Sequence, residues 1–207
     1  MNLLKIKAVL LVLTAVLALF VASPALQRIL APPQTDFYTE LWLLDSAHSA
    51  NNYPFNVTMD RNYTLYLDVS NHLGYCGYYV VEVKLRNDVM PYPGSFNYTP
   101  VNLPSLTNLT TFVPNKSTIE IPLQFSIKYT SDWTKLRVNF TEMTLNNVKL
   151  NLTGYSTTFR PQVPRGFFGN VYFELWLYNT TSGELQYNNR YVNLPLNMTV
   201  LITKSIV

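Results

Sequence analysis

From residue 37 onward, apolar and polar residues alternate with a period of two. A period of two puts successive side chains on opposite faces of a strand, so each stretch has one apolar and one wet polar face. Pro, Gly and Asn turns separate the stretches, and no segment after residue 30 keeps a helical period. We therefore expect an all-β fold, a single antiparallel β-sandwich of the immunoglobulin-like kind. The alternating stretches are residues 65–70, 79–86, 119–128, 136–140, 148–152, 171–177 and 196–202.

Two proline-containing segments interrupt the alternation, residues 88–109 and residues 155–169. We expect both to be loops or edge connections, acting either as recognition loops or as solvated spacers. Pro122 lies inside an alternating stretch, and a proline there predicts an edge strand or a bulge, because it cannot donate a ladder hydrogen bond.

The first thirty residues differ from the rest. Lys5 and Lys7 precede an uncharged apolar run, residues 8–22, which fades through residues 23–26 to Arg28. Such a segment enters a membrane. Because positively charged residues stay on the cytoplasmic side, Lys5 and Lys7 predict that the C-terminal part of the chain is exported. It suits a retained membrane anchor over residues 8–26 or a cleaved signal, for which Ala22, Ser23 and Ala25 offer small-residue sites.

A third interpretation is a pilin-like helix, because residues 7–10 are similar to an archaeal prepilin processing site. In each case we expect three parts: a membrane anchor or signal segment over residues 1–30, a proline-rich linker over 31–36, and an extracellular β-domain over 37–207.

Charge excludes nucleic acid as a partner. The formal net charge is +3, yet beyond residue 30 six lysines and six arginines balance twelve acidic residues. No basic field remains for a phosphate backbone. Cys76 is the single cysteine, so no intrachain disulfide forms; it is either a small packed thiol or an intermolecular bridge.

Nine asparagines lie in Asn-x-Ser/Thr triplets, whereas 21 asparagines and 33 serines and threonines in 207 residues would give roughly three by chance. In an exported chain this excess predicts N-linked glycosylation, and the acceptors inside expected strands, Asn139, Asn151 and Asn197, occupy the polar phase. A glycan coat would keep a low-charge surface soluble and protect sheet edges. The alternative is that Asn and Thr are simply common on β surfaces. The nine are Asn56, Asn62, Asn97, Asn108, Asn115, Asn139, Asn151, Asn179 and Asn197.

Catalytic patterns are missing from the sequence. It has no glycine-rich phosphate loop, nucleophile elbow or His-Glu-x-x-His helix. His48 and His72 fall in expected turns, and the four-residue spacing of His72 and Cys76 makes ligands only on a helix. Glycosidase carboxylates are conceivable, but no spacing selects a pair, and outward polar phase accounts for most candidates. We expect no catalytic residue, no cofactor and no metal. The carboxylates considered are Glu40, Glu174, Asp45 and Asp68.

Several short motifs, in consistent order, resemble an archaeal membrane-protein ectodomain family of unassigned function. They are residues 37–44 (FYTELWLL), 53–58 (YPFNVT), 67–72 (LDVSNH) and 173–178 (FELWLY), then Arg190-Tyr191 and a final Asn-Met-Thr strand. The likeness spans about residues 37–199; the proline-rich segments, the single hydrophobic segment and the lack of Gly after Leu44 depart from it. It implies an archaeal, membrane-associated, non-catalytic extracellular β-domain.

The chain is also similar in general character to the glycosylated thread-filament subunits of thermoacidophilic archaea, in which an N-terminal segment completes the sheet of a neighbouring subunit. Triplet density, low charge, the lack of disulfides and the extended tail of residues 26–35 carry this second likeness. We expect a glycosylated surface protein with a structural or interaction role, held by its anchor and contacting itself or other cell-envelope proteins. The alternative is a secreted filament subunit, cleaved near residues 22–25, whose residues 26–35 add as a strand to the next copy.

Overall fold

The computed structural model describes residues 7, 9–18, 37–87, 90, 99–162 and 164–200. The chain divides into two compact units, Met1–Asp36 and Phe37–Val207. In the first unit residues 9–18 are helical, and the Thr14 hydroxyl donates to the Leu10 carbonyl at 3.0 Å. Within these described ranges no helix is both long and apolar enough to cross a bilayer. The expected cleavage region, residues 22–25, and the linker, residues 31–36, lie outside the described residues.

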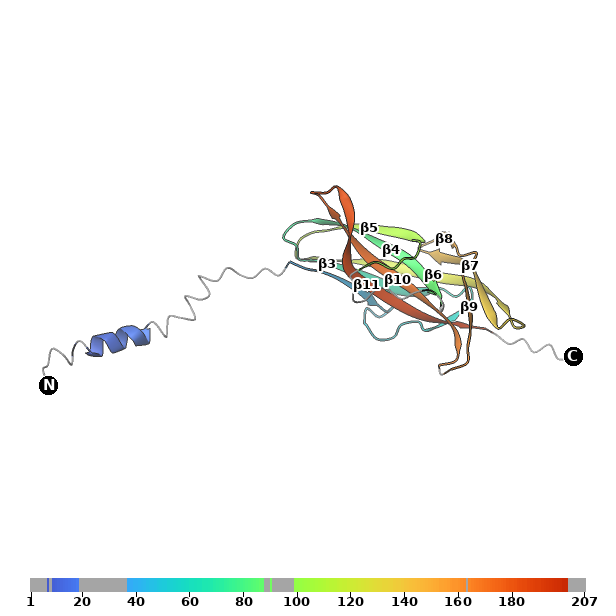
Figure 1. Cartoon of the computed structure of the whole chain (residues 1–207), viewed down its shortest axis with the longest axis horizontal. Coiled ribbons are helices and arrows are strands. Elements are labelled where there is room, and N and C mark those ends of the chain that lie inside the picture. Colours follow the sequence, from blue (N-terminus) through green and yellow to red (C-terminus); the bar gives the residue numbers. More distant parts are fainter. Residues whose placement is uncertain are drawn as a thin grey trace. The chain divides into compact units, whose positions relative to one another are not determined.

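The second unit is mostly β-structure, and its strands form a curled sheet (Figure 1). Antiparallel pairing orders one group as β1-β3-β6-β7, with β8 beside β7. The bounds in this group are Thr39–Leu44 for β1, Tyr63–Asn71 for β3, Ser117–Asp132 for β6, Arg137–Leu145 for β7 and Val148–Asn151 for β8.

A second group has the order β5-β4-β10-β11-β2, in which β2 is parallel to β11. A further strand, β9 (Ser156–Arg160), pairs with both β7 and β10 and joins the two groups into one sheet. The bounds in the second group are Asn56–Thr58 for β2, Gly77–Asn87 for β4, Thr107–Val113 for β5, Gly166–Asn179 for β10 and Glu184–Thr199 for β11.

The two groups share one hydrophobic core. Leu67 and Ile127 from the first group and Val83 and Phe173 from the second belong to the same buried cluster. These residues sit in the apolar phase of their strands, so the period-two pattern places them on the inner face. The core is therefore built by the alternation seen in the sequence.

One hydroxyl ties three strands together at the margin of this core. Tyr129 of β6 donates its hydroxyl to the carbonyl of Thr199 in β11 at 2.7 Å, and the carbonyl of Val57 in β2 lies 3.0 Å away. Tyr129 is 5 % exposed, and burial raises the pKa of its phenol. The contact holds the short strand β2 against the end of β6.

The prediction of a wet outer face is wrong for β4 and β10. Their polar-phase residues Lys84, Arg86 and Glu174 are buried, together with Val101 from the segment that follows β4. Part of the expected loop 88–109 therefore covers the outer face of these strands, and its last residues, from Thr107, begin β5. Residues 88–89 and 91–98 lie outside the described residues.

The second expected loop, residues 155–169, is also corrected. It is a hairpin in which β9 pairs with the start of β10, Arg160 opposite Gly166 and Phe159 opposite Phe167. Pro161 and Pro164 lie between the two strands, in the connection, where a missing N–H breaks no ladder.

Pro122 lies at a position of β6 where its missing N–H breaks no ladder hydrogen bond, as the edge-strand prediction requires. It faces Tyr66 of β3, and its carbonyl accepts a hydrogen bond from Asn146 Nδ2 (2.9 Å) on the β7 side. The N–H and C=O of one strand residue point to the same side, so the absent N–H also faces that side. Within the described chain, no strand pairs with β6 there before Phe125.

Candidate functional site

The structure describes eight of the nine predicted glycan acceptors, and none of the eight is buried. Asn56, Asn62, Asn108 and Asn151 are exposed. Four more are half-buried: Asn115, Asn139, Asn179 and Asn197. Asn97 lies outside the described residues. Every described acceptor therefore sits at the surface of the β-domain.

Two acceptors form Asx turns with the threonine of their own triplet. The Asn151 side-chain oxygen accepts the N–H of Thr153 at 2.9 Å, and that of Asn179 accepts the N–H of Thr181 at 2.8 Å. These bonds fix the side-chain oxygen. Glycans attach to the other amide atom, Nδ2, which at the exposed Asn151 is left at the surface.

Asn197 is in a different environment. Its Nδ2 donates to Asn56 Oδ1 at 3.0 Å, and its Oδ1 accepts the N–H of Phe167 at 3.1 Å. Gly166 packs so closely that an added Cβ would lie 2.1 Å from that oxygen. Both ends of the Asn197 amide are thus held by neighbouring backbone and side chains.

Among the carboxylates considered for catalysis, Glu174 is the most deeply buried, at 0 % exposure. Its Oε1 accepts the N–H of Val101 at 2.7 Å, and its Oε2 lies 2.7 Å from Lys84 Nζ. The Lys84 ammonium also donates to Glu82 at 2.9 Å and to the Val101 carbonyl at 3.1 Å. Burial acts to lower the pKa of Lys84, but hydrogen bonds and the charges of Glu174 and Glu82 outweigh it, so the pKa is raised.

This ion pair serves the fold. It fixes the segment after β4 that contains Val101, here called the covering segment, on the outer face of β4 and β10. Glu174 lies in the polar phase of β10, but the expectation that this outer face is wet is wrong, because the segment that contains Val101 covers it. The sequence gives little sign of this cover, since that segment follows β4 without any strand pattern.

Asp45 organises a turn. Its two side-chain oxygens accept the backbone N–H groups of Ala47, Ser49 and Asn52 and the Ser49 hydroxyl, at 2.8–3.0 Å. The N–H groups of Ser49 and Asn52 are the main reason that its pKa falls to about 2. A carboxylate this fully bonded to its own loop has no free oxygen for proton transfer.

Asp68 lies opposite Glu120 in the β3–β6 ladder and opposite Trp42 in the β1–β3 ladder. Burial, and then the Glu120 charge, raise its pKa, while His48 acts in the other direction. His48 bonds to Glu120 at 2.7 Å and stacks on Tyr66 with ring centroids 3.9 Å apart. The fourth candidate, Glu40, is half-buried on the neighbouring strand β1.

Metal-ligating groups do not come together in the part of the chain that the structure describes. No group of three or more His, Cys, Asp or Glu side chains there could hold an ion. His72 stacks on Tyr38, with ring centroids 4.4 Å apart. Cys76 is free and exposed, so the interpretation as a packed thiol is wrong.

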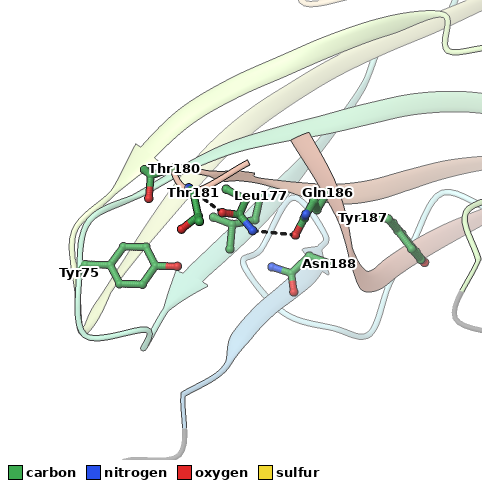
Figure 2. A pocket seen from close by; sticks show the side chains of 8 residues that line it. Tyr75, Leu177, Thr180, Thr181, Gln186, Tyr187 and Asn188 are labelled. Atoms are coloured by element: carbon green, nitrogen blue, oxygen red, sulfur yellow. Dashed lines mark hydrogen bonds between the residues drawn. The ribbon is translucent and has the colours of Figure 1, made fainter. Parts of the chain in front are cut away.

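A pocket of about 350 Å³ lies at the end of the β10–β11 hairpin (Figure 2). Tyr75, from the turn before β4, contributes a ring and Leu177 an apolar side chain, whereas the ring of Tyr187 in β11 points away from the other lining residues (Figure 2). The remaining lining residues are neutral and polar: Asn179, Thr180, Thr181, Gln186 and Asn188. Asn179 Nδ2 donates to Gln186 Oε1 at 3.1 Å within the pocket wall.

A β-bulge brings Asn188 to this pocket. Leu175 pairs with Arg190 and Trp176 with Tyr187, so Asn188 and Asn189 have no partners on β10. Asn189 has a φ of 53°, in the left-handed region that Asn tolerates. Sequence reasoning missed this site; the Asn188-Asn189 pair inside an otherwise apolar–polar strand was the available signal.

Comparison with protein-family models and with curated protein sequences found no match. Among solved structures, the chain is similar to a CARDB domain from Pyrococcus furiosus in complex with di-metal ions, at 10 % identity over 79 % of this chain and 88 % of that one, with a TM-score of 0.36.

It is also similar to a chain of the zinc 2-glycoprotein–prolactin inducible protein complex from human seminal plasma, at 9 % identity over 81 % of this chain and all of that one, with a TM-score of 0.37. A β-glucosidase from Listeria innocua in complex with isofagomine matches at 10 % identity and a TM-score of 0.36, over 79 % of this chain and 16 % of that one.

Proposed function

We propose that this chain is a non-catalytic, glycosylated archaeal cell-surface protein with a structural or interaction role. One observation carries the proposal: a threefold excess of glycosylation triplets whose eight described acceptors all avoid the core. Asparagine is mostly exposed in any folded protein, so the excess of triplets is the evidence, and the surface position of the acceptors is the condition that glycosylation requires.

In this proposal the curled sheet is folded into an immunoglobulin-like β-sandwich. The support is the shared core: inner-face side chains of β3 and β6 belong to the same buried cluster as those of β4 and β10. Two groups of strands whose inner faces share one core in this way are arranged as the two layers of a sandwich.

The non-catalytic role has support from the carboxylates. Glu174 is bound to Lys84 and Val101, and Asp45 to its own loop, so two of the four candidate acids are already committed to structure. A general acid or base needs an oxygen within reach of a substrate proton.

Glycopeptide mapping of the native protein tests the proposal at individual sites. We expect glycans at the exposed Asn62 and Asn151, and an unmodified Asn197, because both ends of its amide are already bonded. If the recovered peptides include every triplet and those that contain Asn62 and Asn151 carry no glycan, the proposal is contradicted.

The membrane is the proposed attachment site, through residues 8–26, with the β-domain outside the cell. N-terminal sequencing of the membrane and culture-supernatant fractions tests this part separately. A start at or near Met1, in the fraction that resists high-salt washing, is expected. A start between residues 23 and 26, in shed material, would replace the anchor with a cleaved signal.

The alternative function, a secreted filament subunit, has one favourable observation. Beside residues 117–123 of β6, on the β7 side, the described chain places no strand. Thr118 and Glu120 point their backbone groups to that side, as Pro122 does, and the core-facing Ile119 and Ile121 are only half-buried there. An added strand would satisfy those groups and cover the two isoleucines.

Residues 26–35 of a second copy are the strand proposed for this position, although Pro32 and Pro33 limit how many N–H groups they can donate. Electron microscopy of shed material tests the alternative. Polymers built from chains that lack the first 22–25 residues would favour it, and only monomers of such chains would reject it.

A further inference from the structure

The pocket beside the β10–β11 hairpin has a lining chemistry that selects its ligand. None of its described lining residues carries a charge, and five of the eight are Asn, Gln or Thr. Its volume of about 350 Å³ falls in the range of roughly 300–1,000 Å³ that small-molecule sites occupy.

Asn188 has an unpaired amide donor in the wall of the pocket. Its Nδ2 is buried and has no hydrogen-bond partner in the described chain, so the amide has to turn toward the pocket before it can donate to a ligand. The bulge that presents it requires the left-handed Asn189, a conformation that most residues avoid. Bulges commonly re-aim a side chain toward a binding site, and a buried donor without a partner costs folding free energy unless something accepts from it.

The lining excludes most ligand classes. A charged ligand would lose its hydration without meeting an opposite charge, and an apolar ligand would leave the amides unpaired. Each hydroxyl of a neutral polyhydroxylated molecule can both donate and accept a hydrogen bond. The Asn, Gln and Thr side chains of the pocket also carry both donors and acceptors, so they can pair with such a molecule. The Tyr75 ring and Leu177 provide apolar surface for its C–H groups (Figure 2).

We infer that this pocket binds a neutral sugar residue of an oligosaccharide, toward which the Asn188 amide turns as donor, with Tyr75 as the apolar platform. Such a residue has two possible sources. One is a glycan that this chain itself carries. The other is a glycan carried by a different molecule. The pocket itself does not depend on whether this chain is glycosylated.

Binding is tested with the full-length chain made in a host without N-glycosylation and purified in detergent. The probes are the methyl glycosides of glucose, galactose, mannose and N-acetylglucosamine, observed by saturation-transfer NMR and titration calorimetry. We expect saturation transfer to at least one glycoside. No transfer to any of the four would overturn the inference.

Variants locate the binding. Asn188→Leu keeps the side-chain size but removes the donor, and should weaken binding by about 3- to 10-fold, as the loss of one hydrogen bond predicts. Asn193→Leu, at an exposed position of the same strand, is the matched control and should leave affinity unchanged. If the two variants weaken binding equally, the pocket is not the site.

Tyr75→Ala gives a second measurement if Asn188→Leu does not fold, because Tyr75 lies in an exposed turn. Its control is Tyr191→Ala, a tyrosine of similar chemistry that does not line the pocket. Loss of binding in the first and retention in the second is expected, and retention in both would overturn the inference.

The native protein separates the two sources. If the unglycosylated chain binds and the native chain does not, one of the chain's own glycans fills the pocket. If both bind, the sugar comes from another molecule. An absence of glycans on the native protein would contradict the proposed function, yet the measurements on the unglycosylated chain would stand.

Discussion

Two buried carboxylates are stabilised by different means in this protein. Glu174 meets the ammonium of Lys84, whereas Asp45 meets three backbone N–H groups and a hydroxyl. The first pair is costly to break, since either partner alone would be a buried charge. The second interaction is local, and it depends on the carboxylate being ionised.

Replacing Lys84 by Met should lower the free energy of unfolding by about 3–5 kcal/mol, because Glu174 would be left buried without a cation. Chemical denaturation measures this change. Lys135→Met is the control, since Lys135 is exposed, and should change stability by less than about 0.5 kcal/mol. A loss below about 1 kcal/mol for Lys84→Met would show that the pair does not hold the covering segment.

Asp45→Asn should lower stability at neutral pH, and the difference from the parent should shrink in acid. The folded-state pKa of Asp45 is depressed to about 2, so its contribution is complete above the unfolded value of about 3.9 and is lost as pH falls toward 2. Denaturant titrations between pH 6 and 2 measure the difference. Glu184→Gln controls for the loss of one negative charge, and a pH-independent gap would contradict the assignment.

At the scale of strands, the sequence predicted what local periodicity controls. The strands β3, β4, β6 and β10 lie where residues 65–70, 79–86, 119–128 and 171–177 alternate. The misses depend on contacts distant in the chain. Prolines in residues 155–169 hid a hairpin, and the covering of β4 and β10 depends on Val101 reaching Glu174, 73 residues away.

The candidate site was harder to predict than the fold. The nine proposed glycan acceptors follow from a three-residue pattern, so the sequence alone names them, and their glycosylation stays a prediction. The pocket needs a turn at Tyr75 and a bulge at Asn188 to meet, and no local pattern encodes that meeting. The Asn188-Asn189 pair is the local sign of the bulge, but the alternation of apolar and polar residues does not distinguish it from other polar positions.

Tyr129→Phe tests how β2 is held. Removing one hydroxyl leaves the carbonyls of Val57 and Thr199 without their donor, so the free energy of unfolding should fall by about 1–3 kcal/mol. Hydrogen exchange should show faster opening of β2 and of the end of β11. Tyr191→Phe, at a half-exposed outer position, is the control. Equal losses in the two variants would reject the role of this hydroxyl.

For the whole molecule, low charge and many surface asparagines belong together in this account. Beyond residue 30 the acidic and basic residues cancel, so charge repulsion contributes little to solubility. Edges such as β5 and the first half of β6 are also open in the described chain, and open edges invite aggregation. Glycans on the surrounding acceptors would protect both the surface and the edges.

The intact mass of the native protein tests this central claim most directly. The bare polypeptide has a mass of 23.8 kDa. We expect a heavier, heterogeneous species that chemical deglycosylation reduces to the mass of the polypeptide, with or without its N-terminal segment. A native mass equal to the unmodified polypeptide, full-length or cleaved, would contradict the account.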